Sequence, residues 1–328
     1  MANNYNYSKI LIDNTLFFSL VDYHNNHFVS GNLDRILEFY DSFSNKDALI
    51  SWMRERPKGN YAIREFKGNR DIVIVIPTAD INNKYARNCR ENIFNSLQII
   101  FVESGYNNYY FNYAHNCNAG IKKALEYNPK WIIVSNDDMY KIDDISKLRE
   151  ELTVIDNNSV MNVFTMPSIY HSYQTCIGTR RLLLTDWAYF IFNLFTKKNL
   201  PTYRTTKKIA KKHKYNLRWM LGPRNKFLCK LFLSNVYPYT MTSCFSILSS
   251  KFCKARNEVF NETYLNGIED WELSIELSNS SQQIIDFKIG DMIGESLGNS
   301  SLRSIRDLVN LVYFNDRIKL LMPENNLQ

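Results

Sequence analysis

The stretch Asp71-Ile-Val-Ile-Val-Ile-Pro77 decides the fold class of this 328-residue chain. A continuous β-branched run that ends at a proline is typical of a strand covered on both faces. Two comparable runs follow, Gln98-Ile-Ile-Phe-Val102 and Trp131-Ile-Ile-Val-Ser135. The intervals between the runs leave room for a helix each time, so we predict a parallel, right-handed βαβαβ unit.

Amphipathic segments fill both intervals. We predict a helix over about 82–96, and a second helix that begins after Asn112, a good N-cap residue, and ends before Pro129. Each carries a stripe of apolar residues at helical spacing. The stripes are Ala86, Cys89, Ile93 and Leu97 in the first helix, and Ala114, Cys117, Ile121 and Leu125 in the second. The prediction is an α/β domain with helices on a mostly parallel, Rossmann-like sheet.

The remaining chain is organised around this unit. We expect short helices over 33–43 and 46–56, and a C-terminal helix over about 303–321 that packs on the core or extends an interface. Its apolar residues are Leu308, Leu311, Val312 and Leu320. The predicted parts are a helical extension (1–70), a nucleotide-binding α/β half (71–168), an acceptor-binding half (169–300) and the C-terminal helix (301–328).

Composition narrows the class of protein. Hydrophobic residues make up 45% of the chain and aromatic residues 14%, which argues against disorder. The six cysteines form no CxxC pair, so we expect a reduced, cytoplasmic setting with buried thiols and no zinc site. The apolar patch Leu16 to Val21 is too short for a signal peptide or a membrane span.

Polar residues follow each predicted strand: Thr78-Ala79-Asp80, Glu103-Ser104-Gly105 and Asn136-Asp137-Asp138. Ligands of open α/β sheets bind at the carboxyl ends of the strands, and paired carboxylates there suit Mg²⁺ or Mn²⁺ held against a phosphate. An isolated Asn-Asp pair is also an ordinary turn. The first strand lacks a GxGxxG motif and the chain lacks GxxxxGK[ST], which disfavours a dinucleotide dehydrogenase and a P-loop ATPase.

Five segments, in this order and with compatible gaps, resemble the motifs of family 2 glycosyltransferases with the GT-A fold, of rhamnosyltransferase-like type. They are Val73–Thr78, Phe101–Gly105, Phe111–Gly120, Val134–Asp138, and Phe260–Tyr264 together with Ile268–Asp270. The resemblance implies an inverting hexosyltransferase. Such an enzyme moves a sugar from a nucleoside-diphosphate sugar to a hydroxyl of a glycan or a lipid-linked acceptor.

The resemblance also implies a nucleotide-sugar site. Pro77, Thr78 and Ala79 would line the base pocket, and Glu103 would contact the base or the ribose. Asn118 matches an asparagine that is common in the family. The alternatives are a solvated turn residue for Glu103 and a solvent-facing helical residue for Asn118.

The carboxylates take further roles by resemblance. Asp138 would ligate Mg²⁺ or Mn²⁺ against the diphosphate, and Asp137 would touch the ribose or a metal-bound water. Glu295 stands where a metal-binding histidine is usual, and is either a ligand or a surface residue. Asp270, paired with Glu269, would be the base that deprotonates the acceptor. Acids in a first helical turn are also favoured by the helix dipole alone.

Two other classes stay open. A sugar-phosphate nucleotidylyltransferase would share the sheet and the metal, but the glycine-rich loop with an arginine that it normally has is absent after Pro77. A non-catalytic relative that binds a sugar nucleotide or a membrane surface would keep the fold with weaker metal ligands. Asn136 and Glu295 favour this second alternative.

The basic segment 187–257 contains fifteen Lys and Arg and neither Asp nor Glu. The apolar run Leu182 to Phe195 before its lysine cluster is too short to span a bilayer. We expect residues 182–230 to contact an anionic membrane surface peripherally. The alternatives are a core helix followed by a solvated loop, or a basic rim that attracts a diphosphate. No recognition module accompanies the charge, so we do not expect nucleic acid as a partner.

Overall fold

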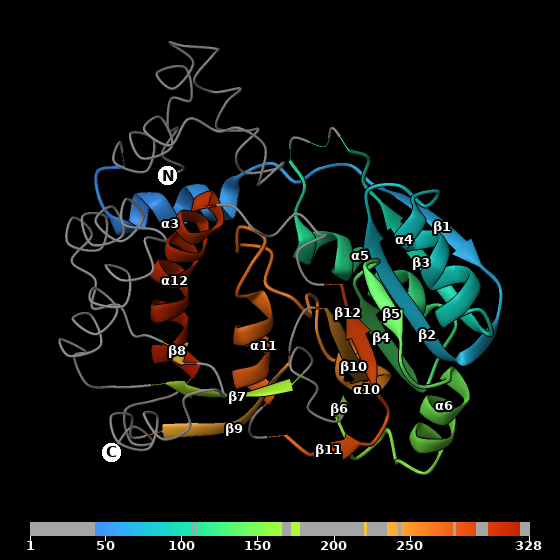
Figure 1. Ribbon diagram of the computed structural model, residues 1–328. Helices are drawn as coiled ribbons and strands as arrows, with labels where there is room; N and C mark the ends of the chain where they lie inside the picture. The colour runs from blue at the N-terminus through green and yellow to red at the C-terminus, as the bar shows by residue number, and fades with distance from the viewer. Residues whose placement is uncertain are drawn as a thin grey trace, which may run out of the picture.

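The computed structural model of this chain is an α/β protein in which helices flank a seven-stranded mixed sheet (Figure 1). The structure describes residues 43–106, 108, 110–165, 172–177, 220–221, 235–241, 244–277, 280–292 and 301–321. Several predictions fall outside these ranges and stay untested. They concern the helix over 33–43, the run Leu182 to Phe195, the lysine cluster that follows it, and Glu295.

The central strands confirm the predicted βαβαβ unit. The sheet order is β1-β3-β2-β4-β10-β6-β11, and β2 pairs in parallel with both β3 and β4. β11 is parallel to β6, whereas β1, β10 and β6 add antiparallel pairs to the sheet. The strands are β1 (Ala62–Phe66), β2 (Asn69–Thr78), β3 (Leu97–Glu103), β4 (Trp131–Ser135), β6 (Asn162–Thr165), β10 (Phe245–Ser249) and β11 (Gln282–Ile285).

Alternate residues of β2 face opposite layers of helices. Ile72, Ile74 and Ile76 belong to a core with α4, a π-helix and α6, and Val73 and Val75 belong to a core with α5, α10 and α11. Because both faces are covered, the strand is apolar throughout its buried part. The helices are α4 (Lys84–Asn88), the π-helix (Cys89–Ile93), α5 (Tyr113–Leu125), α6 (Ile145–Thr153), α10 (Ser250–Lys254) and α11 (Glu269–Leu277).

Local capping explains where the crossover helices begin. Asn112 caps α5 as predicted, and its Oδ1 accepts from the backbone N of His115 at 3.0 Å. Asn83 caps α4 in the same way. The predicted helix over 82–96 is instead α4 followed by the π-helix. Gly120 lets α5 approach β2 closely, because an added Cβ would lie 2.2 Å from Cγ1 of Val75.

The N-terminal region contains one predicted and one unpredicted element. Helix α3 (Lys46–Glu55) confirms the helix expected over 46–56. Strand β1 was not predicted, although it extends the sheet by pairing antiparallel with β3. Its sequence, Ala62-Ile-Arg-Glu-Phe66, carries two adjacent charges at the sheet edge, which is how edge strands avoid further pairing.

The C-terminal helix α12 (Ser301–Leu321) confirms the predicted helix and part of its apolar stripe. Val312 is buried as predicted, whereas Leu320 is 73% exposed, so the packing expected for Leu320 is wrong. The buried face instead includes Arg306 and Asn310, which are 3% and 0% exposed. Apolar spacing did not predict these two residues because their side chains are polar.

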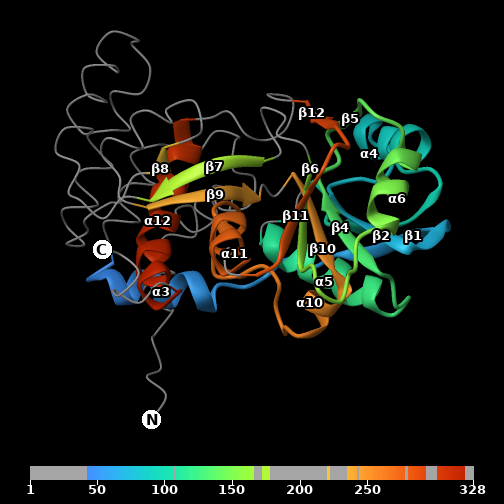
Figure 2. The ribbon, with the colours of Figure 1, turned by 90° about the horizontal axis from the view of Figure 1, so that it is seen from below.

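Two small sheets complete the described chain. β5 (Met139–Lys141) pairs antiparallel with β12 (Ile289–Asp291). β7 (Ser172–Ile177) lies between β8 (Met220–Leu221) and β9 (Asn235–Met241), and β9 lies beside α11 (Figure 2). Within the described part of the chain, no helix is both long and apolar enough to cross a membrane.

Candidate functional site

The carboxyl ends of β2, β3 and β4 meet at one edge of the sheet, which we call the carboxyl edge. Here Thr78 and Asp137 are joined by a hydrogen bond of 2.6 Å from Thr78 Oγ1 to Asp137 Oδ2. Asn83 Nδ2 donates to the same carboxylate oxygen at 3.2 Å. Burial raises the pKa of Asp137, while these two hydrogen bonds act in the opposite direction.

Asp138 lies deeper than its neighbour, with 2% of its surface exposed. Its backbone oxygen accepts from the backbone N of Met292 at 2.9 Å, just beyond β12. The acid doublet is therefore held between the end of β4 and the β5–β12 pair. A buried carboxylate in this place is unusual for a plain turn, because burying a charge is costly unless another group compensates it.

Other predicted donor-site residues lie along the same edge. Glu103 Oε1 accepts from the backbone N of Ile81 at 3.1 Å, and Oε2 pairs with Arg64 Nε at 3.1 Å. Pro77 is in the buried part of β2, and Ala79 O accepts from Gly105 N at 3.0 Å. Glu103 is thus an oriented carboxylate at the end of β3, and not a solvated turn residue.

Asn118 has a structural role that the sequence did not reveal. Its Oδ1 accepts from the backbone N of Val259 and of Phe260, both at 3.0 Å. Its Nδ2 donates to Phe260 O at 2.8 Å and to Glu262 Oε1 at 3.0 Å. These four bonds fill the hydrogen-bonding capacity of the amide. In this conformation Asn118 has no group left for a nucleotide, and it does not face solvent as the alternative expected.

The second acid doublet begins α11, as predicted, but it is more buried than a helix dipole requires. Glu269 is 3% exposed and Asp270 is 8% exposed. Burial, and then the charge of Asp270, raise the pKa of Glu269 to about 7, and Arg306 acts in the opposite direction. Glu269 therefore keeps part of its proton near neutral pH.

The turn before this doublet has a strained backbone. Asn266 has φ +49°, and Ile268, immediately before Glu269, has φ +76°. Asparagine tolerates this left-handed region, whereas a β-branched residue there is an outlier. Such strain persists only where surrounding contacts impose it, and it is found preferentially at functional sites.

Tyr113, in the first turn of α5, contacts both motif segments. Its hydroxyl lies 3.0 Å from Asn136 Oδ1, next to the first acid doublet. Its backbone N donates to Asn266 Oδ1 at 2.6 Å, three residues before Glu269. Helix α5 follows the carboxyl end of β3, so Tyr113 lies near the carboxyl edge. Both doublets therefore lie toward this edge and not on opposite sides of the molecule.

Helix α12 contacts the residues on either side of the second doublet. Asn310 Oδ1 accepts from Leu265 N at 2.7 Å, and its Nδ2 donates to Gly267 O at 2.9 Å. Arg317 pairs with Glu272 at 2.7 Å from Nη2 to Oε1. Sequence reasoning missed Asn310, Tyr113 and Asn266. The dipeptide Asn266-Gly267 is a turn signal, but nothing local in the sequence indicates its partners.

The donor set for a metal is small in the described residues. They contain no group of three or more His, Cys, Asp or Glu side chains placed to hold a metal ion. Mg²⁺ is commonly bound by one or two carboxylates together with substrate phosphate oxygens. The oxygen ligands that Asp137 and Asp138 offer fit a cation shared with a diphosphate, and do not form an all-protein site.

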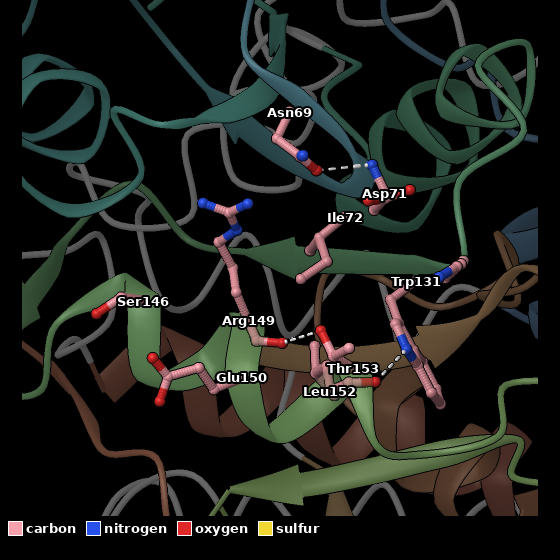
Figure 3. Close-up of a pocket in the computed structure, with 10 residues that line it drawn as sticks. Asn69, Asp71, Ile72, Trp131, Ser146, Arg149, Glu150, Leu152 and Thr153 are labelled. Carbon is pink, nitrogen blue, oxygen red and sulfur yellow. Dashed lines mark hydrogen bonds between the residues drawn. The ribbon is translucent and has the colours of Figure 1, made fainter.

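A cavity of about 310 Å³ lies at the opposite edge of the sheet, at the amino ends of β2 and β4 (Figure 3). Arg149 extends from α6 toward Asn69 on β2, and Trp131 also lines the cavity. None of the residues that line this cavity is a predicted site residue. The cavity is therefore separate from the two acid doublets.

Neither a scan against models of known protein families nor a search of curated protein sequences returned a match for this chain.

Proposed function

We propose that this protein is an inverting glycosyltransferase of the GT-A type that uses a nucleoside-diphosphate sugar as donor. The observation that carries the proposal is the connection of the two acid doublets through Tyr113 at the carboxyl edge. A metal-assisted, inverting glycosyl transfer needs side chains that hold a cation at the leaving diphosphate and a base at the acceptor hydroxyl. The arrangement supplies both from separate segments of the chain.

The strand ends would bind the donor. Thr78 and Glu103 lie where a base and a ribose would reach the sheet, and Asp137 is oriented by Thr78. Asp138, with Asp137, would hold Mn²⁺ or Mg²⁺ against the diphosphate. The cation would stabilise the negative charge that develops on the leaving group.

The doublet at the start of α11 would activate the acceptor, a hydroxyl of a glycan or a lipid-linked saccharide. As the acceptor oxygen bonds to the anomeric carbon, the bond from that carbon to the diphosphate breaks, and the hydroxyl proton passes to Asp270. Glu269 lies beside Asp270, and a carboxyl group with a pKa of about 7, such as Glu269, is suited to exchange a proton at neutral pH. Direct displacement inverts the anomeric configuration and needs no second nucleophile.

A panel of nucleotide sugars with Mn²⁺ tests the proposal through donor hydrolysis and transfer to added acceptors. We expect Asp138→Ala to lose both reactions, and Asp270→Asn to lose transfer while it keeps donor binding. Asp47→Asn, which changes an exposed acid on α3, is the matched control and should behave as wild type. Donor binding without any turnover would contradict the proposal and favour a sugar-nucleotide-binding protein.

A further inference from the structure

Asn136 precedes the acid doublet at the end of β4, and its backbone is held by the residue just before β10 and by the side chain of Ser135. Its N donates to Cys244 O at 2.9 Å, and its O accepts from Ser135 Oγ at 2.9 Å. Only its side chain is therefore left to adjust. That side chain is partly exposed at the carboxyl edge.

The hydroxyl of Tyr113 determines which way this amide faces. It donates to Asn136 Oδ1 at 3.0 Å. Burial, and then the neighbouring Cys117, raise the pKa of Tyr113 well above its usual value, so the hydroxyl keeps its proton. The amide oxygen of Asn136 is thereby engaged. Its nitrogen has no hydrogen-bond partner in the part of the chain that the structure describes.

We propose that Tyr113 is a positioning residue that turns the amide nitrogen of Asn136 toward the carboxyl edge, where Asn136 donates a hydrogen bond to an oxygen of the diphosphate. This role rests on the proposed function, since it requires a diphosphate ligand. In this proposal Asn136 binds the diphosphate and is not a ligand of the cation. The motif then contains one donor residue followed by two acceptor residues.

The charges around the motif explain why a hydrogen-bond donor at position 136 would be useful. Asp138 is buried and Asp137 is partly buried, and an incoming diphosphate brings further negative charge to the same place. A cation offsets part of the repulsion between these acids and the diphosphate. A neutral NH₂ group that donates a hydrogen bond offsets a further part without adding charge. A carboxylate in place of Asn136 would add a third negative group and remove the donor.

Tyr113 is itself held in place, which is what positioning requires. Its backbone N donates to Asn266 Oδ1 at 2.6 Å, and Asn266 Nδ2 donates to Phe111 O at 3.2 Å. The tyrosine thus has a fixed main chain in addition to its side-chain contact. A shift of the turn that carries Asn266 would reach Asn136 through this residue.

Calorimetric titration with UDP, GDP and dTDP, each with Mn²⁺ and with EDTA, tests the inference. For the diphosphate that wild type binds, we expect Asn136→Ala to weaken binding about tenfold or more, as for the loss of a hydrogen bond to a charged group. Tyr113→Phe should weaken it by a smaller factor, without a large change in Tm. Asn136→Asp keeps an acceptor for the Tyr113 hydroxyl, so it should fold, and it should weaken binding most clearly in EDTA.

Tyr127→Phe is the matched control, because it removes a tyrosine hydroxyl that bonds to Glu65 and not to the motif. Its affinity should equal that of wild type. If wild type binds none of the three diphosphates, both this role and the proposed function are overturned. If wild type binds but Asn136→Ala binds equally well, only the role of Asn136 is wrong. If Asn136→Ala weakens binding but Tyr113→Phe does not, Tyr113 has no positioning role. If Asn136→Asp binds the diphosphate more tightly in the presence of Mn²⁺, position 136 faces the cation and not the diphosphate.

Discussion

Glu269 is the residue whose ionisation most directly connects stability with the proposed chemistry. Its pKa rises from the usual 4.5 to about 7 because it is buried next to Asp270. Between pH 4.5 and about 7, Glu269 is protonated to a greater extent in the folded protein than in the unfolded chain. The free energy of unfolding therefore falls as the pH rises through this window, the opposite of a carboxylate stabilised by an ion pair.

Replacing Glu269 with glutamine should remove this dependence. We expect the free energy of unfolding of wild type to fall by about 2 kcal/mol from about pH 5 to about pH 8 through this group, and that of Glu269→Gln to change less. Urea unfolding at a series of pH values measures the difference. Glu258→Gln, an exposed acid nearby in the sequence, is the control. Equal slopes for wild type and Glu269→Gln would contradict the raised pKa.

Asn266 combines a left-handed backbone with two hydrogen bonds, and two substitutions separate these contributions. Asn266→Gly removes the bonds to Tyr113 and Phe111 but tolerates φ +49°. Asn266→Ala removes the same bonds and adds a Cβ penalty of about 1 kcal/mol. We expect both variants to be destabilised in chemical unfolding, and the alanine variant by about 1 kcal/mol more. Equal stability of the two would mean that the turn relaxes out of this conformation.

At the scale of elements, the sequence predicts what depends on local pattern. The strands β2, β3 and β4 were predicted because each is a β-branched run between polar ends, and α5 because Asn112 caps an apolar stripe. β1 was missed because an edge strand carries charges. The bond between Tyr113 and Asn266 joins positions 153 residues apart, so no periodicity reports it. The acid doublets could be located, but their burial could not be predicted.

Helix α12 contacts a buried acid of α11. Glu272 is 2% exposed, accepts from Tyr264 Oη at 2.5 Å, and pairs with Arg317. Removing one partner of a buried pair leaves an uncompensated charge, which is costly. We expect Arg317→Met to lower the free energy of unfolding by about 2–3 kcal/mol in urea unfolding, less than for a fully buried pair because Arg317 is partly exposed.

Lys46→Met supplies the control for this prediction, because it breaks another ion pair of α12. Lys46 Nζ lies 2.5 Å from Asp316 Oδ2, and both side chains are about 30% exposed. Solvent screens such a pair, so its loss should cost less than about 1 kcal/mol. If both variants lose the same stability, the burial of Glu272 does not determine the strength of its pairing.

At the scale of the whole molecule, segments from the beginning, middle and end of the chain meet at the turn that carries Glu269. Arg56, just after α3, donates to Tyr264 O at 2.9 Å, and Asn112 Nδ2 donates to Glu262 O at 2.8 Å. Asn310 adds the bonds from α12, which lies beside α3 and α11 in Figure 1. The second acid doublet thus depends on contacts across the molecule, whereas the first depends on the sheet.

The charge distribution leads to a prediction for the intact protein. The chain has a net charge of +7, and residues 187–257 contain fifteen basic and no acidic side chains. Such a segment should bind anionic phospholipid vesicles in a flotation assay, and binding should weaken at high salt because screening shortens the reach of the charges. Replacing Lys207, Lys208, Lys211, Lys212 and Lys214 with glutamine should abolish most of it. Neutral vesicles are the control. Equal binding to neutral and anionic vesicles, or binding unaffected by salt, would rule out an electrostatic membrane contact and leave the basic segment as a solvated loop or a rim that attracts the diphosphate donor.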